Sequence, residues 1–214
     1  MELEEQKKLA TSMELKALQS QINPHFLFNI INTMASLVRT DPNKARVMLR
    51  EFAVFYRQTL ENSSDLIPLS REIEQTVRYL SLEQARFGED RLAVEVDVED
   101  DIRAMLVPAF MVQPLVENSV KHAMPAEGKL TIRIAGEMDN DDVYLHVSDD
   151  GIGMSEEAVR TIMNPKSQTG LGIAVKNVND RLRGYYGEEA YMNIESELGK
   201  GTEVTLFLYD CAHV

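Results

Sequence analysis

Cysteine is nearly absent from this chain, since Cys211 is the only one among 214 residues. A single thiol cannot form an intramolecular disulfide, so the sequence predicts a protein of a reducing compartment such as the cytoplasm. No apolar run approaches the roughly 20 residues that a membrane helix needs, and no signal peptide precedes Leu3. We therefore expect a soluble protein or the soluble part of a longer one.

Positive charge is also scarce, because 22 Lys and Arg face 35 Asp and Glu, for a formal net charge of -13. Such a surface repels phosphates, so we expect no nucleic-acid partner. No group of Cys and His has the spacing of a zinc site. Hydrophobic residues make up 44% of the chain, enough for one large or two small folded domains.

The first third of the chain has a helical pattern. Residues 2–22 are polar with an apolar stripe, as in a coiled-coil lead-in, and the pattern continues past Pro24, which is expected to bend the helix just before His25. Asp41 and Pro42 then predict the cap and first position of a second helix. We expect an antiparallel helical hairpin that pairs with a second copy in a four-helix bundle. The side chains predicted to lack partners in a single hairpin are Phe26, Ile30, Phe52 and Phe55.

The rest of the chain mixes helices and strands. Ser70 is predicted to cap a third helix that ends near Phe87 and Gly88. Alternating apolar residues predict strands, and 3–4 spaced ones predict helices. The fold class is α+β, a helical hairpin followed by an α/β sandwich, with boundaries at 1–66, 67–88 (a connecting helix) and 89–214. Strands are expected at 92–98, 130–134, 143–147, 191–196 and 202–208, and helices at 108–122, 155–163 and 172–184.

A short motif follows the strand that ends at Val147. Asp149 is placed where a carboxylate can accept a hydrogen bond from the exocyclic amine of a base, and Gly151 and Gly153 let the backbone approach that base. Taken alone, the motif is also typical of an ordinary glycine-containing turn.

Three further segments complete a nucleotide pattern. On a predicted helix, Asn118 offers an oxygen suited to Mg²⁺, one turn from Lys121 and His122, which suit phosphate, although a solvated helix face has a similar composition. Thr169–Gly172 opens a helix, whose free N–H groups attract phosphate, although it also fits an ordinary loop. Gly199–Thr202 leads into the last strand and fits a hairpin turn equally well.

In this order the motifs resemble the Bergerat-fold ATPases, the family of gyrase, mismatch-repair ATPases and sensor histidine kinases. With the segment Gln21–Asn29 upstream, the chain is similar to LytS/YesM-type bacterial sensor kinases from about Leu15 to Leu208. The resemblance implies a Bergerat-type ATP-binding domain and a homodimer. It also implies phosphorylation of a histidine with ATP and Mg²⁺, followed by transfer to an aspartate of a response regulator, in the cytosolic part of a membrane-bound sensor.

The resemblance also implies roles for single residues. His25 is the phosphoacceptor, Asn118 the Mg²⁺ ligand and Asp149 the acceptor for the adenine amine. Around the base, the resemblance implies that Gly151 and Gly153 form the turn beneath it and that Thr202 holds the adenine edge. Lys121 contacts phosphate, and His122 lies near the phosphates or the base. Glu117 either tunes the metal site or caps a helix contact.

Two positions depart from the family pattern. Ala174 stands where a second glycine is common, so either Gly170 and Gly172 supply the flexible pair one step earlier, or the lid is stiffer. Pro114 stands where hydrolytic relatives have a glutamate that activates water, which favours an enzyme that keeps its γ-phosphate for a histidine.

A neutral imidazole is a competent nucleophile near pH 7, so His25 needs no strong base. Asn29, one turn later, either orients the ring of His25 or caps local backbone. His146 and His213 lie on a strand and near the C-terminus and compete poorly as acceptors. Two other interpretations stay open, a Bergerat ATPase that hydrolyses ATP as a conformational switch and a catalytically dead dimeric adaptor. A third, a kinase that acts on serine in a separate partner, would be signalled by transfer that survives loss of His25.

Overall fold

The computed structural model describes residues 24–61, 66–163 and 170–209. The coiled-coil lead-in expected over residues 2–22 and the bend before His25 therefore lie outside the described residues, as do Cys211 and His213. The chain divides into two compact units, Met1–Ser63 and Ser64–Val214. Among the described helices, none is both long and apolar enough to cross a membrane.

The described part of the first unit is the predicted helical hairpin, α2 (Pro24–Thr40) and α3 (Pro42–Glu61). The side-chain oxygen of Asp41 accepts a hydrogen bond from the Lys44 N–H at 3.0 Å, which satisfies a donor of the first turn of α3. Phe26 and Phe55 meet edge to face with ring centroids 5.6 Å apart, so they join the two helices.

The apolar residues that the hairpin leaves exposed differ from those expected. Phe26, Ile30 and Phe55 are buried, and Phe52 is half-buried. This part of the sequence prediction was wrong, because the expected residues lie on the side of each helix that is already packed. The exposed apolar side chains of the hairpin include Phe28, Ile31, Val38, Val47 and Leu49.

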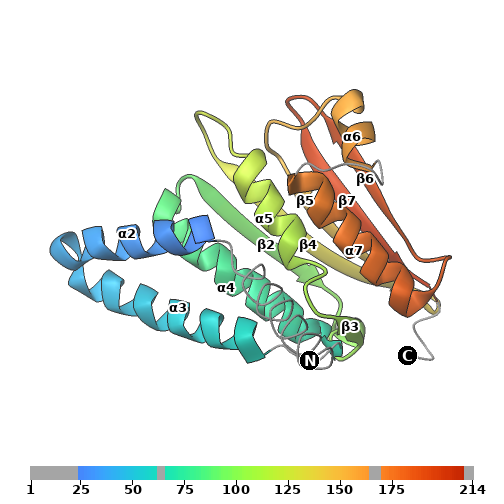
Figure 1. The fold of residues 1–214 in the computed structure, drawn as a ribbon, viewed down its shortest axis with the longest axis horizontal. Coiled ribbons are helices and arrows are strands. Elements are labelled where there is room, and N and C mark those ends of the chain that lie inside the picture. The colour runs from blue at the N-terminus through green and yellow to red at the C-terminus, as the bar shows by residue number, and fades with distance from the viewer. Residues whose placement is uncertain (1–23, 62–65, 164–169, 210–214) are drawn as a thin grey trace, which may run out of the picture. The chain divides into compact units, whose positions relative to one another are not determined.

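The second unit is built on a five-stranded mixed sheet with the order β2-β4-β5-β7-β6 (Figure 1). Strand β2 pairs in parallel with β4, and the other pairs are antiparallel. The register places Asp149 opposite Thr202, so two predicted site residues are neighbours on adjacent strands. The strands are β2 (Leu92–Val98), β4 (Leu130–Asp139), β5 (Asp142–Asp149), β6 (Tyr191–Glu197) and β7 (Gly201–Leu208).

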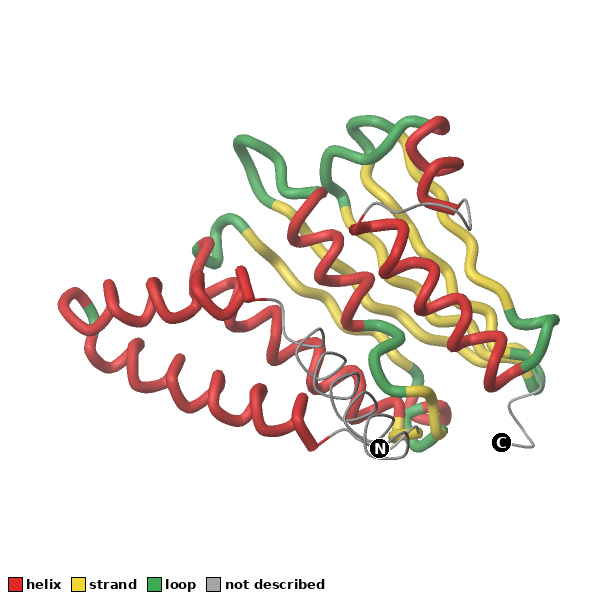
Figure 2. The backbone as a smooth tube through the Cα atoms, in the orientation of Figure 1, coloured by secondary structure: helices red, strands yellow, loops and turns green. Residues whose placement is uncertain are grey.

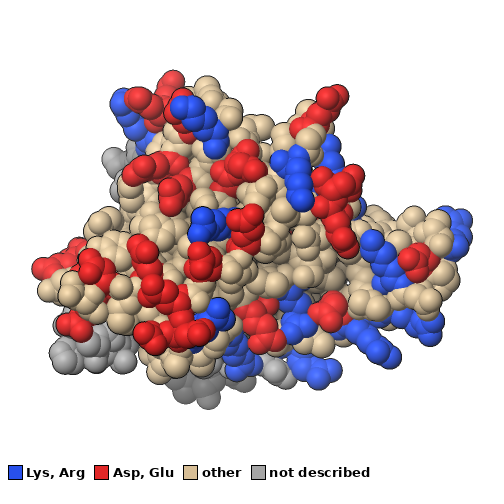
Figure 3. Space-filling model, turned by 180° about the vertical axis from the view of Figure 1, so that it is seen from behind, with Lys and Arg blue, Asp and Glu red and all other residues tan. Residues whose placement is uncertain are grey.

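Helices α4 (Leu69–Phe87), α5 (Gln113–His122) and α7 (Gly170–Tyr186) lie on one face of the sheet (Figure 2). A shorter helix, α6 (Glu156–Met163), lies near β6. Every second residue of β5 is buried, which gives the sheet one apolar face. Acidic side chains are spread over the molecule as seen from behind (Figure 3). Helices followed by a mixed α/β unit confirm the predicted fold class.

Helix α4 does not begin as the sequence predicted. Its N-cap is Pro68, and no side chain caps it, so Ser70 lies inside the first turn. The carbonyls of Met105 and Arg103 accept hydrogen bonds from the N–H groups of Leu69 and Ser70, at 2.8 and 2.9 Å, and so replace a serine cap. The helix ends at Gly88 as predicted. It packs on α5 and β2 and belongs to the second unit, whereas the sequence set residues 67–88 apart as a connecting helix.

The helix expected over residues 108–122 begins five residues later, at Gln113. Residues before it form β3 (Leu106–Pro108), which pairs antiparallel with β1 (Leu66–Pro68), and a short 3₁₀ helix, η1 (Asp100–Ile102), precedes β3. Phe110 has a φ of 61°, a left-handed conformation that an α-helix cannot contain.

Candidate nucleotide-binding site

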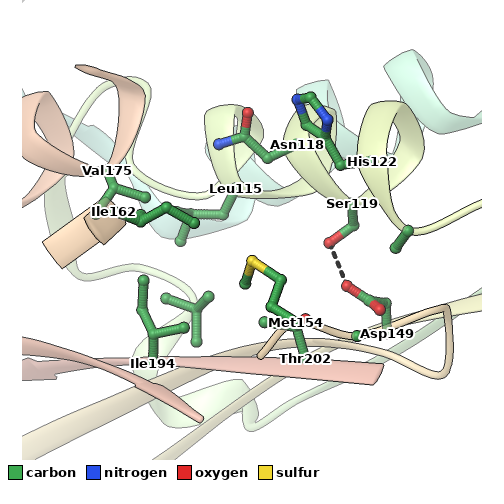
Figure 4. A pocket seen from close by; sticks show the side chains of 13 residues that line it. Leu115, Asn118, Ser119, His122, Asp149, Met154, Ile162, Val175, Ile194 and Thr202 are labelled. Atoms are coloured by element: carbon green, nitrogen blue, oxygen red, sulfur yellow. Dashed lines mark hydrogen bonds between the residues drawn. The ribbon is translucent and has the colours of Figure 1, made fainter. Parts of the chain in front are cut away.

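A cavity of about 490 Å³, part of it open to solvent, is lined by helices α5, α6 and α7 and by strands β5, β6 and β7 (Figure 4). Most of its lining is apolar, with a few polar side chains, as is usual for sites that bind a planar organic group. The lining residues are Leu115, Asn118, Ser119, His122, Ala123, Asp149, Gly153, Met154, Ile162, Val175, Ile194, Thr202 and Val204.

Asp149 is the buried acidic residue of this cavity, with 8% of its surface exposed. Its carboxylate accepts hydrogen bonds from the Ser119 hydroxyl at 2.8 Å (Figure 4) and from the Gly151 N–H at 3.1 Å. Burial raises the pKa of Asp149, while these donors and the backbone N–H of Thr202 oppose the rise. An ionised carboxylate offers about four acceptor positions, so it retains capacity for a donor on a ligand.

The glycines of the loop after β5 are required by packing within the protein itself. A Cβ on Gly151 would collide with the carbonyl oxygen of Ala123 at the end of α5. A Cβ on Gly153 would collide with the carbonyl oxygen of Glu197, and Gly153 also has a φ of 63°. The sequence interpretation explained both glycines by the approach of a base. In the structure they let the loop pack against α5 and the β6–β7 turn.

The hydroxyl groups of Ser196 and Thr202 connect β6 and β7 to the loop that contains Met154. Ser196 Oγ lies 2.8 Å from Thr202 Oγ1, donates to the Gly201 carbonyl at 2.9 Å and accepts from the Met154 N–H at 2.8 Å. Thr202 is therefore tied to the loop that contains Met154. Sequence reasoning missed Ser119 and Ser196. The signal for Ser119 was its place in the sequence, directly after the predicted site residue Asn118.

Helix α5 divides its predicted site residues between two faces. Asn118 and His122 line the cavity, whereas Glu117 and Lys121 are outside its lining. The reason is helical spacing, because residues 118 and 122 share a face and residues 117 and 121 share another. Burial, followed by the charge of Lys121, lowers the pKa of His122.

Glu117 interacts within its own helix. Its carboxylate accepts a hydrogen bond from Gln113 Nε2 at 2.7 Å, and burial raises its pKa. Of the two roles left open for Glu117, the contact within the helix is the one that this geometry favours.

Asn118 is the side chain that fits a metal ligand. Its Nδ2 atom is buried without a hydrogen-bond partner among the described residues. A buried amide in this state suits a bound group, and its oxygen and nitrogen exchange places by a half-turn. The described residues contain no group of three His, Cys, Asp or Glu that could hold a metal. Mg²⁺ here would thus take its other ligands from phosphates and water.

Helix α7 begins at Gly170, two residues before the start expected at residue 172, so the run from Gly170 to Gly172 forms its first turn. Ala174 lies inside this helix rather than in a turn. Gly170 and Gly172 lie in the same helix, so the structure agrees with the helical placement of Ala174, while the role of the two glycines as the flexible pair stays a prediction.

His25 lies in the other unit, exposed on α2. Asn29 Nδ2 is 3.1 Å from His25 Nδ1, one helical turn away, so the contact expected between these side chains is present. His146, by comparison, lies on β5 with 25% of its side chain exposed and contacts Glu203 at 3.2 Å.

Two family models match this chain. The model described as "Histidine kinase" matches residues 13–92, and the one described as "Histidine kinase-, DNA gyrase B-, and HSP90-like ATPase" matches residues 108–210.

Curated relatives cover nearly all of this chain. "Sensor protein LytS" of Bacillus cereus is 43% identical over 211 residues, 97% of this chain and 36% of the relative. The protein of the same name from Bacillus subtilis is 40% identical over 210 residues, 95% of this chain and 35% of the relative. "Sensor histidine kinase/phosphatase LytS" of Staphylococcus aureus is 39% identical over 201 residues, which are 91% of this chain and 34% of the relative. This chain thus spans about a third of the length of these relatives.

Solved structures show the same fold at low identity. The histidine kinase domain of the blue-light activated histidine kinase EL346 from Erythrobacter litoralis aligns with a TM-score of 0.52 at 16% identity, over 96% of this chain and 94% of that one. The histidine kinase AdeS of Acinetobacter baumannii aligns with a TM-score of 0.51 at 17% identity, over 92% of this chain and 94% of that one.

Proposed function

Because this chain belongs to the family of LytS-type sensor histidine kinases, we propose that it transfers the γ-phosphoryl group of ATP to His25 and then to an aspartate of a response regulator. The observation that carries the proposal is the buried carboxylate of Asp149 in a largely apolar cavity that is also lined by Asn118, whose Nδ2 atom has no partner among the described residues. A purine with an exocyclic amine fits the first group, and a metal-bound phosphate fits the second.

The residues of the cavity bind and orient the nucleotide. Asp149 accepts a hydrogen bond from the adenine amine, and Ser119 and Gly151 fix the carboxylate for that purpose. Thr202 holds the edge of the base. Asn118 would supply an oxygen to Mg²⁺, and the bound ion would neutralise charge on the phosphates. Lys121 and the start of α7, with Gly170 and Gly172, attract the phosphates from outside the described cavity lining.

We assign the attack to Nε2 of His25, with Nδ1 carrying the proton. On α2, Asn29 Nδ2 lies 3.1 Å from His25 Nδ1. A half-turn of the Asn29 amide exchanges its nitrogen and oxygen, so that the oxygen accepts a hydrogen bond from Nδ1. A bond forms from Nε2 to the γ-phosphorus as the bond to the bridging oxygen breaks, and ADP leaves with the electron pair. Positioning and charge neutralisation then supply most of the catalysis.

The partners follow from the same proposal. The exposed apolar side chains of α2 and α3, among them Phe28 and Val38 at 66% and 61% exposure, support a homodimer through this hairpin. As the family resemblance implies, the proposal includes that the chain is the cytoplasmic part of a membrane-bound sensor.

The deciding experiment is incubation of the chain with γ-labelled ATP and Mg²⁺, followed by acid and by alkali. We expect protein-bound label that acid removes and alkali leaves, as for phosphohistidine. ATP labelled on the α-phosphate is the matched control and should label nothing. Free phosphate without labelled protein would instead indicate a hydrolytic switch, and absence of nucleotide binding would indicate an adaptor.

A further inference from the structure

The N-terminus of α5 has no cap of its own. Its N-cap position is Val112, and no side chain of the helix start accepts a hydrogen bond there. The residues just before it include Phe110, whose φ of 61° costs energy unless its surroundings hold it in place. The start of this helix therefore depends on groups from elsewhere in the unit.

Glu72 of α4 supplies the missing acceptors. Its Oε1 accepts from the N–H groups of Val112 and Gln113 at 3.0 and 3.3 Å, and its Oε2 accepts from Phe110 at 3.0 Å. Only 1% of Glu72 is exposed, so these amides lie around a carboxylate that water does not reach. Burial raises the pKa of Glu72, while backbone donors from residues 110–113 oppose the rise.

The preceding segment is held at two more points. Arg181 of α7 donates to the carbonyl oxygen of Ala109, and the Tyr186 hydroxyl donates to that of Leu106 at 3.1 Å. These contacts fix the chain leading into α5. Among the side chains in the described contacts, only Glu72 accepts from amides of the helix start, whereas the Leu115 N–H donates to the Val112 carbonyl at 3.1 Å.

We propose that Glu72 is a positioning residue for the nucleotide site, because its carboxylate caps α5 from another helix and so fixes Asn118 and Ser119 in the cavity. The helix has 10 residues, and Asn118 lies five residues from Gln113, which is about 7.5 Å along the axis. A short rigid rod transmits a displacement of its first turn to both side chains. Asp149 depends on Ser119 for one of its hydrogen bonds, so it is affected as well.

This inference rests on the proposed nucleotide function. The test uses Glu72→Gln, which keeps the length and one acceptor oxygen but sets an NH₂ group against a backbone donor. The matched control is Glu74→Gln on the same helix, where the carboxylate is 58% exposed and pairs with Arg78.

Two measurements are made below the unfolding transition of each variant. Hydrogen exchange without nucleotide reports the amides of residues 110–113 and of α5. Equilibrium binding reports the Kd for Mg-ATP. We expect Glu72→Gln to speed exchange in these segments and to raise the Kd about five- to tenfold, since a buried donor is left unsatisfied. Glu74→Gln should match the wild type in both.

A variant that is less stable but binds Mg-ATP with wild-type Kd would overturn the inference, since it would mean that Glu72 serves folding alone. Unchanged exchange at residues 110–113 would overturn it as well. Absence of Mg-ATP binding by the wild type and by Glu74→Gln would refute the proposed function instead, and the exchange data would still decide whether Glu72 caps α5.

Discussion

The α2–α3 hairpin and the α/β unit differ in how much apolar surface they leave exposed. In the sheet, Leu130, Ile132 and Leu206 are fully buried, whereas Phe28, Val38 and Val47 of the hairpin are more than 60% exposed. The polar residues differ too, because those of the α/β unit converge on a cavity and His25 stands exposed on a helix. We therefore expect nucleotide binding to belong to the α/β unit and assembly and phosphoryl acceptance to belong to the hairpin.

The sharpest test of this division removes the acceptor. His25→Gln should abolish protein labelling by γ-labelled ATP, because an amide is no nucleophile, while the Kd for Mg-ATP should stay within about twofold of wild type. His146→Gln on β5 is the matched control and should label normally. If His25→Gln were labelled as strongly as the wild type, the acceptor would be another residue, and the hairpin would not be assigned phosphoryl acceptance.

The converse change is Asp149→Asn. Loss of a charged acceptor should weaken Mg-ATP binding up to about 100-fold, since a hydrogen bond to a charged group is worth about 1.5–3 kcal/mol. Asp150→Asn is the matched control, because Asp150 is exposed and bonds the Thr131 N–H at 2.6 Å. Binding titrations should show the loss in the first variant alone, and equal affinities in both would refute the role of Asp149.

The charge of Asp149 should favour ATP binding but disfavour folding, because the carboxylate is buried. Burial raises the folded-state pKa of Asp149, so its contribution to stability is complete below the unfolded pKa and is lost as pH rises through the folded pKa. As pH rises through that folded pKa, the unfolding midpoint of the wild type should therefore fall relative to that of Asp149→Asn, which does not titrate. ATP affinity should instead fall on acidification, beginning at a higher pH than for an ordinary aspartate.

Assembly gives a third test. Leu49→Ala in α3 removes apolar surface from the proposed dimer interface and should raise the dimer dissociation constant about 100-fold, since part of a leucine side chain is worth about 1.5 kcal/mol and the homodimer loses two of them. Leu106→Ala, an exposed leucine of the α/β unit, is the control and should leave it unchanged. Sedimentation measures both, and a wild-type protein that is monomeric at micromolar concentration would contradict the proposed homodimer.

Much of the α/β unit could be predicted from the sequence because its signals are local. Alternation identified the five strands of the main sheet, and the position of Asp149 after a buried strand identified the cavity residue. The same reasoning failed for β1 and β3, which have three residues each, too short for any periodicity. It also extended α5 back to Pro108, because helix propensity does not reveal the left-handed Phe110.

The residues that sequence reasoning missed act over long distances in the chain. Glu72 contacts amides 38 to 41 residues away, and Ser119 contacts Asp149 across 30 residues. A glutamate in an amphipathic helix looks like part of a solvated face until the fold places it against a helix terminus. The hairpin shows the same limit, since a helical stripe does not reveal which of its residues pack within the unit.

The smallest expected effect concerns Ala174, where a glycine is common in the family. Because Ala174 lies inside α7, Ala174→Gly should lower the free energy of unfolding by about 1 kcal/mol and leave ATP affinity unchanged or weaker. Ala85→Gly in α4 is the matched control, since it carries the same helical cost in a half-buried position away from the start of α7. Denaturant titrations should show similar losses for both variants. ATP binding then separates the two alignments: if Ala174→Gly bound ATP more tightly than the wild type while Ala85→Gly did not, the position would need the left-handed conformation of a turn. In that case Gly170 and Gly172 would not be the flexible pair, and the start of α7 would have to unwind for the nucleotide to bind.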